Sequence, residues 1–352
     1  MVALAFVVAA AYAVPPAQVS AQSSSALSIA PKKNYVIEPG KSVEDKLVIR
    51  NADSNKQLDL TLRVVDFTYT DNGGTPKLFF DPDAPQTTWS LKPFMTIPET
   101  VTIPAGGTKS LDMKVTIPKG HGAGSYYSAI VYSSGGGSGN AGGDRSGSVG
   151  LSASGVTLVF TQIPGKVSEN LTLKKFGAYQ NNQNDGAESG YMNFTMKEPF
   201  NMAYTLKNNG NVTEAPVGNI TLKSMFGQEY TINDVNPTGS LALIGQTRTY
   251  TTCIKLKEQD EGTRSSSNST KTCVSPGLWP GLYTAKLDLF YGQNGNTTQE
   301  LQGSTWFWYL PWWFILLVVV VLALIAFGIW RITNKVKTAR GRRVRLNKSG
   351  RK

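Results

Sequence analysis

The alternation of apolar and polar residues is the feature that most constrains this chain, because it extends over most of the length before residue 300. Every second residue is apolar in segments 58–64, 111–117 and 283–291. A period of two places these side chains on one face of a β-strand. Gly, Pro, Asn and Asp separate the segments, and no convincing helical pattern precedes residue 309. The pattern predicts an all-β body of antiparallel Ig-like β-sandwiches.

The alternation shifts by one residue within one expected strand. The alternating apolar residues from Leu58 to Val64 share one face of the strand. The apolar series then continues on the other face, at Val65, Phe67 and Tyr69. A shift of one residue moves every following side chain to the opposite face of the sheet. The sequence therefore predicts a β-bulge at this point.

Three strand markers occur twice in the same order, which indicates a weak internal repeat. They are Arg50-Asn51 with Lys207-Asn208, Gly107-Thr108-Lys109-Ser110 with Gln246-Thr247-Arg248-Thr249, and Gly124-Ser125-Tyr126 with Gly281-Leu282-Tyr283. The repeat predicts one sandwich over residues 27–165 and a second over residues 167–303. The Gly/Ser-rich stretch 133–150 falls inside the first copy, so we interpret it as a hairpin loop.

The second copy contains a polar insertion that is bracketed by the two cysteines of the chain, Cys253 and Cys273. Export from the cytoplasm would allow these cysteines to be oxidised. We expect a disulfide between them, and two free thiols are the alternative.

An uncharged stretch between Glu300 and Arg331 predicts a membrane span. Its core, Trp312–Trp330, has 19 residues, and a helix of that length measures about 28 Å, close to the thickness of the hydrocarbon layer. We expect a transmembrane helix over residues 309–330, and a buried core helix is the alternative. Aromatic residues favour the membrane interfaces, so the expected anchors are Trp306, Trp308, Trp312, Trp313 and Trp330.

The formal charge of +11 is concentrated in residues 331–352, which hold ten basic residues and no acidic one. Basic residues beside a span resist translocation, so this tail is expected to be cytoplasmic and the body extracellular. The tail could alternatively bind nucleic acid or a phosphorylated partner. The rest of the chain is nearly neutral, so no nucleic-acid partner is expected. The residues expected to set the topology are Arg331, Lys335, Lys337, Arg340, Arg342, Arg343 and Arg345.

The N-terminus is typical of an export signal. Residues 2–14 are apolar, Pro15 and Pro16 interrupt them, and Val19-Ser20-Ala21 offers the small residues of a cleavage site. We expect a signal peptide over residues 1–21, with an uncleaved anchor as the alternative. Together, the two ends predict a single-pass protein of the cell membrane.

Several fragments resemble the WxL-interacting proteins, a family of bacterial membrane-anchored surface proteins. They are IAPKKNYVIEPGKSVEDKLVIRN, VTIPAGGTKSLDMKVTIP and GAGSYYSAIVYSS in the first half, and YTLKNNGNVTEAPVGNITLKSMFG and WPGLYTAKLDLFYG in the second. The resemblance implies that the first domain binds peptidoglycan and that the second contacts partner or host proteins. It assigns no ligand-binding residue.

The sequence predicts no enzyme, no cofactor and no metal site. The single histidine, His121, lies in a Gly-rich turn, and one histidine with two cysteines cannot supply the four ligands of a zinc finger. Trp89 and Trp279 are candidates for stacking on a sugar, although a role as core or rim residues of a sandwich is the favoured interpretation of each. Lys32 and Lys33 are expected on a solvated face.

Three functions follow from these features. The first is a non-enzymatic surface protein that binds cell-wall glycan or partner surface proteins. The alternative is an assembly factor that pairs with a strand of a secreted protein at an exposed sheet edge. A hydrolase acting on the cell wall is the third, and the scarcity of catalytic residues disfavours it.

Overall fold

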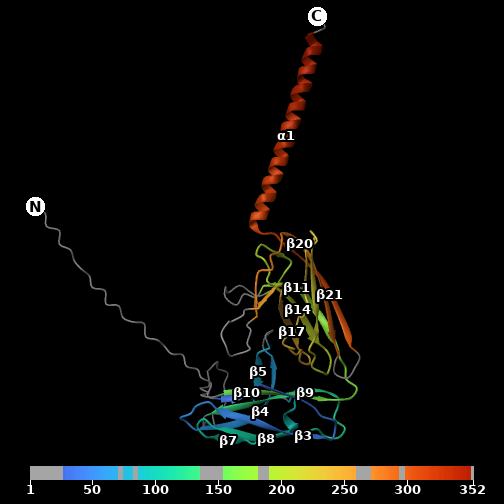
Figure 1. Cartoon of the computed structure of the whole chain (residues 1–352). Coiled ribbons are helices and arrows are strands. Elements are labelled where there is room, and N and C mark those ends of the chain that lie inside the picture. Colours follow the sequence, from blue (N-terminus) through green and yellow to red (C-terminus); the bar gives the residue numbers. More distant parts are fainter. Residues whose placement is uncertain are drawn as a thin grey trace, which may run out of the picture.

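The computed structural model describes residues 27–349 except residues 70–73, 82–85, 135–153, 181–189, 259–270 and 293–297. It consists of two tandem β-sandwiches followed by one long helix (Figure 1), which confirms the predicted fold class. The expected signal peptide and most of the Gly/Ser-rich stretch lie outside the described residues.

The first sandwich contains two sheets around one apolar core. One sheet has the order β1 (Leu27–Ile29), β3 (Ser42–Asn51), β8 (Thr108–Thr116) and β6 (Met95–Thr96). The other has the order β2 (Lys32–Val36), β10 (Ser154–Ile163), β9 (Gly124–Ser134), β4 (Leu58–Tyr69) and β5 (Pro76–Phe79), with β7 (Thr100–Ile103) also beside β4. A short 3₁₀ helix spans Lys92–Phe94. The alternating leucines, valines and isoleucines fill the space between the sheets.

The second sandwich repeats this plan. One sheet has the order β12 (Gly190–Met192), β11 (Leu171–Gln180), β14 (Asn201–Asn208) and β17 (Thr247–Cys253). The other has the order β13 (Phe194–Thr195), β21 (Gln299–Tyr309), β20 (Gly281–Tyr291), β15 (Val217–Ser224) and β16 (Glu229–Ile232). A small hairpin of β18 (Leu256–Glu258) and β19 (Lys271–Cys273) lies outside both sheets.

The sequence repeat corresponds to equivalent strands. In each sandwich the marked Asn ends a strand that pairs antiparallel with the strand opened by the second marker, and the Gly-x-Tyr marker opens β9 or β20. In each, the last strand also pairs in parallel with a short early strand, β10 with β2 and β21 with β13. The repeat therefore describes the topology of both domains.

The bulge predicted in β4 is wrong. The pairing of β4 with β9 keeps one register from Leu60↔Ser134 to Val65↔Ala129. The first half of β4 is buried on one face only, whereas Val65 and Phe67 are buried on the opposite face. The apolar series changes face because a second surface covers this part of the strand, and the backbone stays regular.

The second sandwich ends later than expected. Strand β21 pairs with β20 without interruption as far as Gly281↔Tyr309, so the domain continues beyond residue 303. Pro311 precedes the helix α1 (Trp312–Ser349), which therefore begins three residues after the expected start of the span at residue 309. Proline suits this position because the first helical N–H groups have no partner within the helix. Helix α1 also continues through most of the basic segment.

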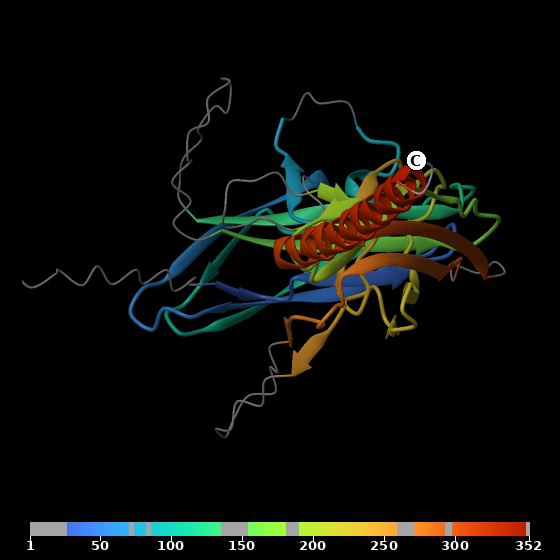
Figure 2. The ribbon, with the colours of Figure 1, turned by 90° about the horizontal axis from the view of Figure 1, so that it is seen from above.

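Among the described residues, one helix is long and apolar enough to cross a membrane, and it extends over Trp312–Lys335 with no part buried inside the protein. This helix leaves the second sandwich at the end remote from the first one (Figure 1). In the view from above it lies in front of the sandwiches (Figure 2).

Candidate site between the two sandwiches

The two sandwiches meet through an apolar cluster that both contribute. On the first sandwich, the outer face of β4, β9 and β10 carries Phe67, Tyr127 and Phe160. On the second, Leu243 is fully buried against them. Burial raises the pKa of Tyr127, and a hydrogen bond to the backbone of Ile244 partly offsets this effect. Burying apolar side chains from both domains stabilises a defined arrangement of the two.

Polar contacts reinforce this junction. Gln246 Nε2 donates to Thr68 Oγ1 and to the Tyr69 carbonyl oxygen, each at 2.7 Å. At the start of β9, the Ser125 N–H donates to the Asn211 carbonyl at 3.0 Å, and the Thr213 N–H donates to Ser125 Oγ at 3.0 Å. Several directed bonds between the domains specify one relative orientation.

Arg248 strengthens the same contact from the second sandwich. Its guanidinium lies 5.0 Å from the ring centroid of Tyr69 and 5.3 Å from that of Tyr250. Nη1 donates to the Leu241 carbonyl at 2.6 Å. A buried guanidinium stacked between two tyrosines is a strong cation–π arrangement, because little water screens it.

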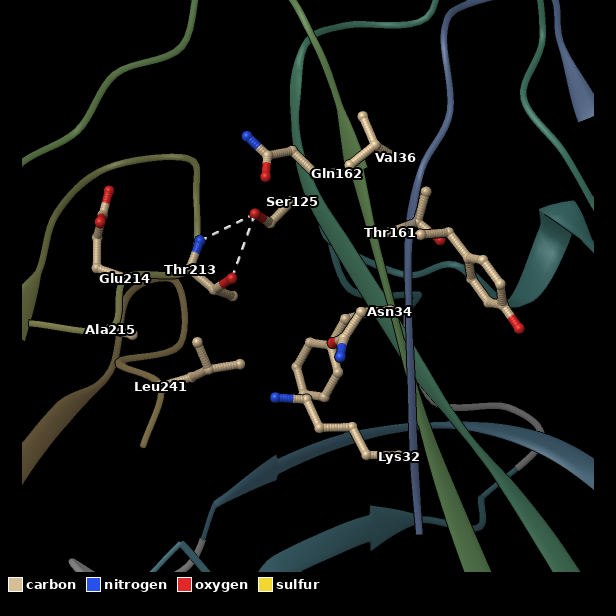
Figure 3. A pocket seen from close by; sticks show the side chains of 12 residues that line it. Lys32, Asn34, Val36, Ser125, Thr161, Gln162, Thr213, Glu214, Ala215 and Leu241 are labelled. Atoms are coloured by element: carbon tan, nitrogen blue, oxygen red, sulfur yellow. Dashed lines mark hydrogen bonds between the residues drawn. The ribbon is translucent and has the colours of Figure 1, made fainter. Parts of the chain in front are cut away.

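Beside this junction lies a hollow of about 360 Å³ (Figure 3). Its wall on the first sandwich comes from β2, β9 and β10, and includes Lys32, Asn34 and Val36. The opposite wall belongs to the second sandwich, with Thr213, Ala215 and Leu241 among its residues.

Strand β2 forms the edge of its sheet next to the hollow. It pairs only with β10, and no other described strand lies on its outer side. The Leu158 N–H donates to the Pro31 carbonyl, and the Ile37 N–H donates to the Gln162 carbonyl. In a parallel ladder the bonded residues alternate, so Lys32, Asn34 and Val36 direct their N–H and C=O groups away from β10. An outer edge of this kind is a template for another strand.

Of the two lysines expected on a solvated face, Lys32 is exposed, whereas Lys33 is mostly buried in a contact between the two sheets. Lys33 and Tyr35 both donate to the carboxylate of Asp45 on β3. These bonds lower the pKa of Asp45 to about 2, with the bond from Lys33 as the larger cause. The contact fastens β2 to the other sheet of the sandwich.

Lys32 points to the other side, into the hollow. Its Nζ lies 4.8 Å from the ring centroid of Phe160, and burial lowers its pKa. Among the described residues no carboxylate forms an ion pair with Lys32. The nearby Glu214 carboxylate is turned away from it (Figure 3). That carboxylate accepts a hydrogen bond from the Gly292 N–H at 3.2 Å.

The predicted disulfide is present. Cys253 and Cys273 are bonded, with their Cα atoms 5.3 Å apart. It ties the β18–β19 hairpin to the end of β17, where Asn201 pairs with Cys253. This end of the second sandwich faces away from the junction, so the disulfide is not part of the hollow.

The remaining candidate residues, Trp89, Trp279 and His121, occupy three different places in the structure. Trp89 stacks on Tyr127 with 6.0 Å between ring centroids and packs against the junction cluster, so it is a packing residue. Trp279 is 63% exposed, at the far end of the second sandwich. His121 is held edge-to-face between the rings of Phe94 and Tyr126, at 4.8 and 4.7 Å.

The expected membrane anchors occupy two different elements. Trp306 and Trp308 belong to strand β21, and Trp312, Trp313 and Trp330 belong to α1. Of the expected topology-setting residues, Arg331 and Lys335 lie on α1, and Arg331 is placed over the Phe327 ring at 5.7 Å. The side chains of Lys337, Arg340, Arg342, Arg343 and Arg345 lie outside the described part.

Sequence reasoning missed the edge of β2 and the role of Leu243. The shift of the apolar series in β4 was the available signal for a second buried face. No sequence pattern marks the open edge of β2, because its being open depends on which strand is last in the sheet.

No protein-family model and no curated protein matches this sequence. Solved structures with a similar fold include a chain of the chaperone–tip adhesin complex of CFA/I fimbriae biogenesis, with 10% identity, 79% of this chain and 98% of that chain covered, and a TM-score of 0.35. The E. coli chaperone DraB has 10% identity, coverage of 79% and 95%, and a TM-score of 0.31. The Salmonella enterica SafA pilin–SafB chaperone complex gives 8% identity, coverage of 79% and 96%, and a TM-score of 0.30. At these identities and scores, the likenesses carry no information about what this chain binds.

Proposed function

We propose that this protein is a membrane-anchored, non-enzymatic binding protein that receives an extended segment of another surface or secreted protein. The open outer edge of β2, directly beside the hollow between the sandwiches, carries this proposal. A strand added there would bond to the backbone of β2 and place alternate side chains over the hollow. Val36 and Leu241 favour apolar side chains in that strand, and Lys32 favours an acidic group.

The junction supports this role because it fixes the second wall of the hollow. An edge five residues long offers only a few backbone bonds, so a partner strand also needs contacts from the opposite wall. Leu241 and Thr213 supply such contacts at a position set by the buried cluster. A preformed groove lowers the entropic cost of binding an extended chain.

The proposed anchor is α1, with the sandwiches outside the cell and the basic segment in the cytoplasm. The apolar span followed by basic residues supports this orientation. Protease added to intact, wall-stripped cells should remove the sandwiches and spare a C-terminal tag. Digestion of the tag with survival of the sandwiches would reverse the orientation.

Strand addition can be tested with the full chain in lipid nanodiscs and a phage-displayed library of random dodecapeptides. Asn34→Pro removes one outward N–H and leaves the bonds of Lys33 and Tyr35 to β10 in place, whereas the matched control Asn34→Ala keeps the backbone intact. We expect selected peptides to lose at least about tenfold in affinity for Asn34→Pro and to bind the control normally. Equal binding to both variants would exclude pairing at this edge.

Glycan binding by the first sandwich is the competing function. Sedimentation of the same nanodiscs with purified peptidoglycan tests it. If the wild type sediments with peptidoglycan and selects no peptide, the strand-binding proposal is wrong and the glycan function replaces it.

A further inference from the structure

The exposed apolar residues of the second sandwich gather at one end of the domain. Ten large apolar side chains of its described part are exposed, compared with Val36, Val48 and Phe80 in the first sandwich. Eight of the ten lie at the end where α1 begins, and the two others, Val217 and Phe290, pair with each other at the opposite end. The eight are Phe194, Met196, Phe200, Met225, Phe226, Leu256, Trp279 and Trp306.

Strand pairing shows that this end lies next to the start of α1. Phe194 pairs with Trp308, and the Leu310 N–H donates to the Thr195 carbonyl at 3.0 Å. Gly281 pairs with Tyr309. Trp312 follows Tyr309 by three positions, and three residue steps span at most about 11 Å. The patch must therefore stay close to the membrane surface once α1 is inserted.

A fixed backbone presents these side chains. The Met225 N–H donates to the Leu282 carbonyl at 2.9 Å, and the Phe226 N–H donates to Ser224 Oγ at 3.1 Å. Gly281 has φ +150°, and a Cβ added to it would lie 3.2 Å from Met225 Sδ and from Phe226 Cε2. The missing side chain at Gly281 thus allows both residues to lie across the strand.

Trp279 is held in a similar way. The Tyr283 hydroxyl donates to the Trp279 carbonyl at 2.9 Å, and Pro280 follows. The indole nevertheless stays 63% exposed. An anchored backbone with an exposed ring indicates a surface that is complete only against another phase or partner.

The charges at this end also suit a lipid surface. Lys197 and Lys255 are exposed there. The carboxylate of Glu198 is half-buried and accepts hydrogen bonds from Ser275 Oγ and the Leu278 N–H. Two exposed lysines beside an acid that already accepts hydrogen bonds within the protein favour anionic headgroups.

We infer that the α1-proximal end of the second sandwich docks onto the bilayer that α1 crosses, with Phe226 and Trp279 inserted into the interfacial layer. This inference rests on the proposed insertion of α1. Docking would hold the second sandwich upright on the membrane and set the direction in which the hollow faces. Interfacial insertion of aromatic side chains gains both from apolar burial and from the amphipathic character of tryptophan.

The test uses full-length protein in nanodiscs of phosphatidylcholine and phosphatidylglycerol, with photoreactive benzoylphenylalanine in place of Phe226, Trp279, Phe290 or Leu322. Position 322 lies within α1, so lipid adducts there show that α1 is inserted in the bilayer. Position 290 lies at the far end of the same sandwich and is the matched control. We expect lipid adducts at 322, 226 and 279, with capture at 226 and 279 at least about tenfold above that at 290.

Adducts at 322 without adducts at 226 and 279 would overturn docking and leave the anchor intact. Failure at 322 as well would overturn the anchor itself. Adducts between two protein chains at 226 or 279 would make the patch a protein interface and reject the lipid surface. Quenching by brominated lipids gives a second measurement, taken as the difference between the wild type and Trp279→Phe; equal quenching in both proteins would also reject docking.

Discussion

The two sandwiches share one topology and differ in what each of them meets at its C-terminal end. In the first, Gly124 opens β9 and lies against the Asn211 carbonyl of the second sandwich, where a Cβ would be only 2.7 Å away. In the second, the equivalent Gly281 lies under Met225 and Phe226. The same end of the repeated unit is thus covered by protein in one copy and left apolar and exposed in the other.

This comparison shows how one unit can serve two junctions. Near its C-terminal end, the first sandwich has apolar residues on the outer face of β4 and β9, and the second sandwich covers them. The second sandwich is followed by α1, so its corresponding end has a membrane as its neighbour in our proposal. The composition of each end follows its neighbour, whereas the cores between the sheets stay alike.

Leu243→Asp should have the largest effect of the changes considered, because it places a charge in the apolar cluster that joins the two sandwiches. We expect the junction to lose at least about 3 kcal/mol, since an unpaired carboxylate is buried among apolar rings. The two sandwiches should separate, and small-angle scattering of the nanodisc-bound protein should show a larger radius. Val36→Asp is the control, because Val36 is 72% exposed. A compact Leu243→Asp protein would show that the junction does not depend on this cluster.

Removal of the disulfide should affect the second sandwich alone. In the chain-entropy model, a crosslink across a separation of 20 residues contributes about 3 kcal/mol. Denaturant unfolding of Cys253→Ala/Cys273→Ala should show this loss in the transition of the second domain. A matching loss in the first domain would mean that the two sandwiches unfold as one unit.

The two repeat asparagines should behave alike. Asn51 Nδ2 donates to the carbonyls of Lys56 and Pro104, and Asn208 Nδ2 donates to those of Val212 and Ala242. Alanine at either position removes both bonds, which are part-buried at Asn51 and buried at Asn208, and this costs about 2 kcal/mol. Chemical denaturation of the two variants tests the equivalence, and a large effect at one position only would limit the repeat to topology.

Acidification should have the smallest effect on stability, and only in the first sandwich. The folded-state pKa of Asp45 lies near 2, below the ordinary 3.8, so its stabilising contribution is complete above about pH 4. It is lost as the pH falls toward 2, because the carboxylate must then bind a proton. Asp45→Asn should flatten this part of the pH profile of the first sandwich and leave the second unchanged. An unaltered acid profile would show that the contact does not hold β2 in place.

Much of the fold could be predicted because it is encoded in local patterns. Alternation in segments such as 111–117 defined the strands, repeated markers such as Asn51 and Asn208 defined two copies, and an uncharged run defined α1. The disulfide followed from two cysteines that bracket an insertion. Strand periodicity, composition and spacing are properties of the chain itself, so they need no knowledge of what packs against what.

The tertiary structure alone decided which surfaces meet. It showed that Val65 and Phe67 pack against the second sandwich and that β2 is the last strand of its sheet. It also showed that Trp89 is half-buried against the junction cluster, whereas Trp279 is exposed. Each of these facts depends on contacts between residues far apart in the sequence. An apolar residue has the same local pattern whether a second domain, a membrane or solvent covers it, and for that reason the candidate site and the docking surface became visible only in three dimensions.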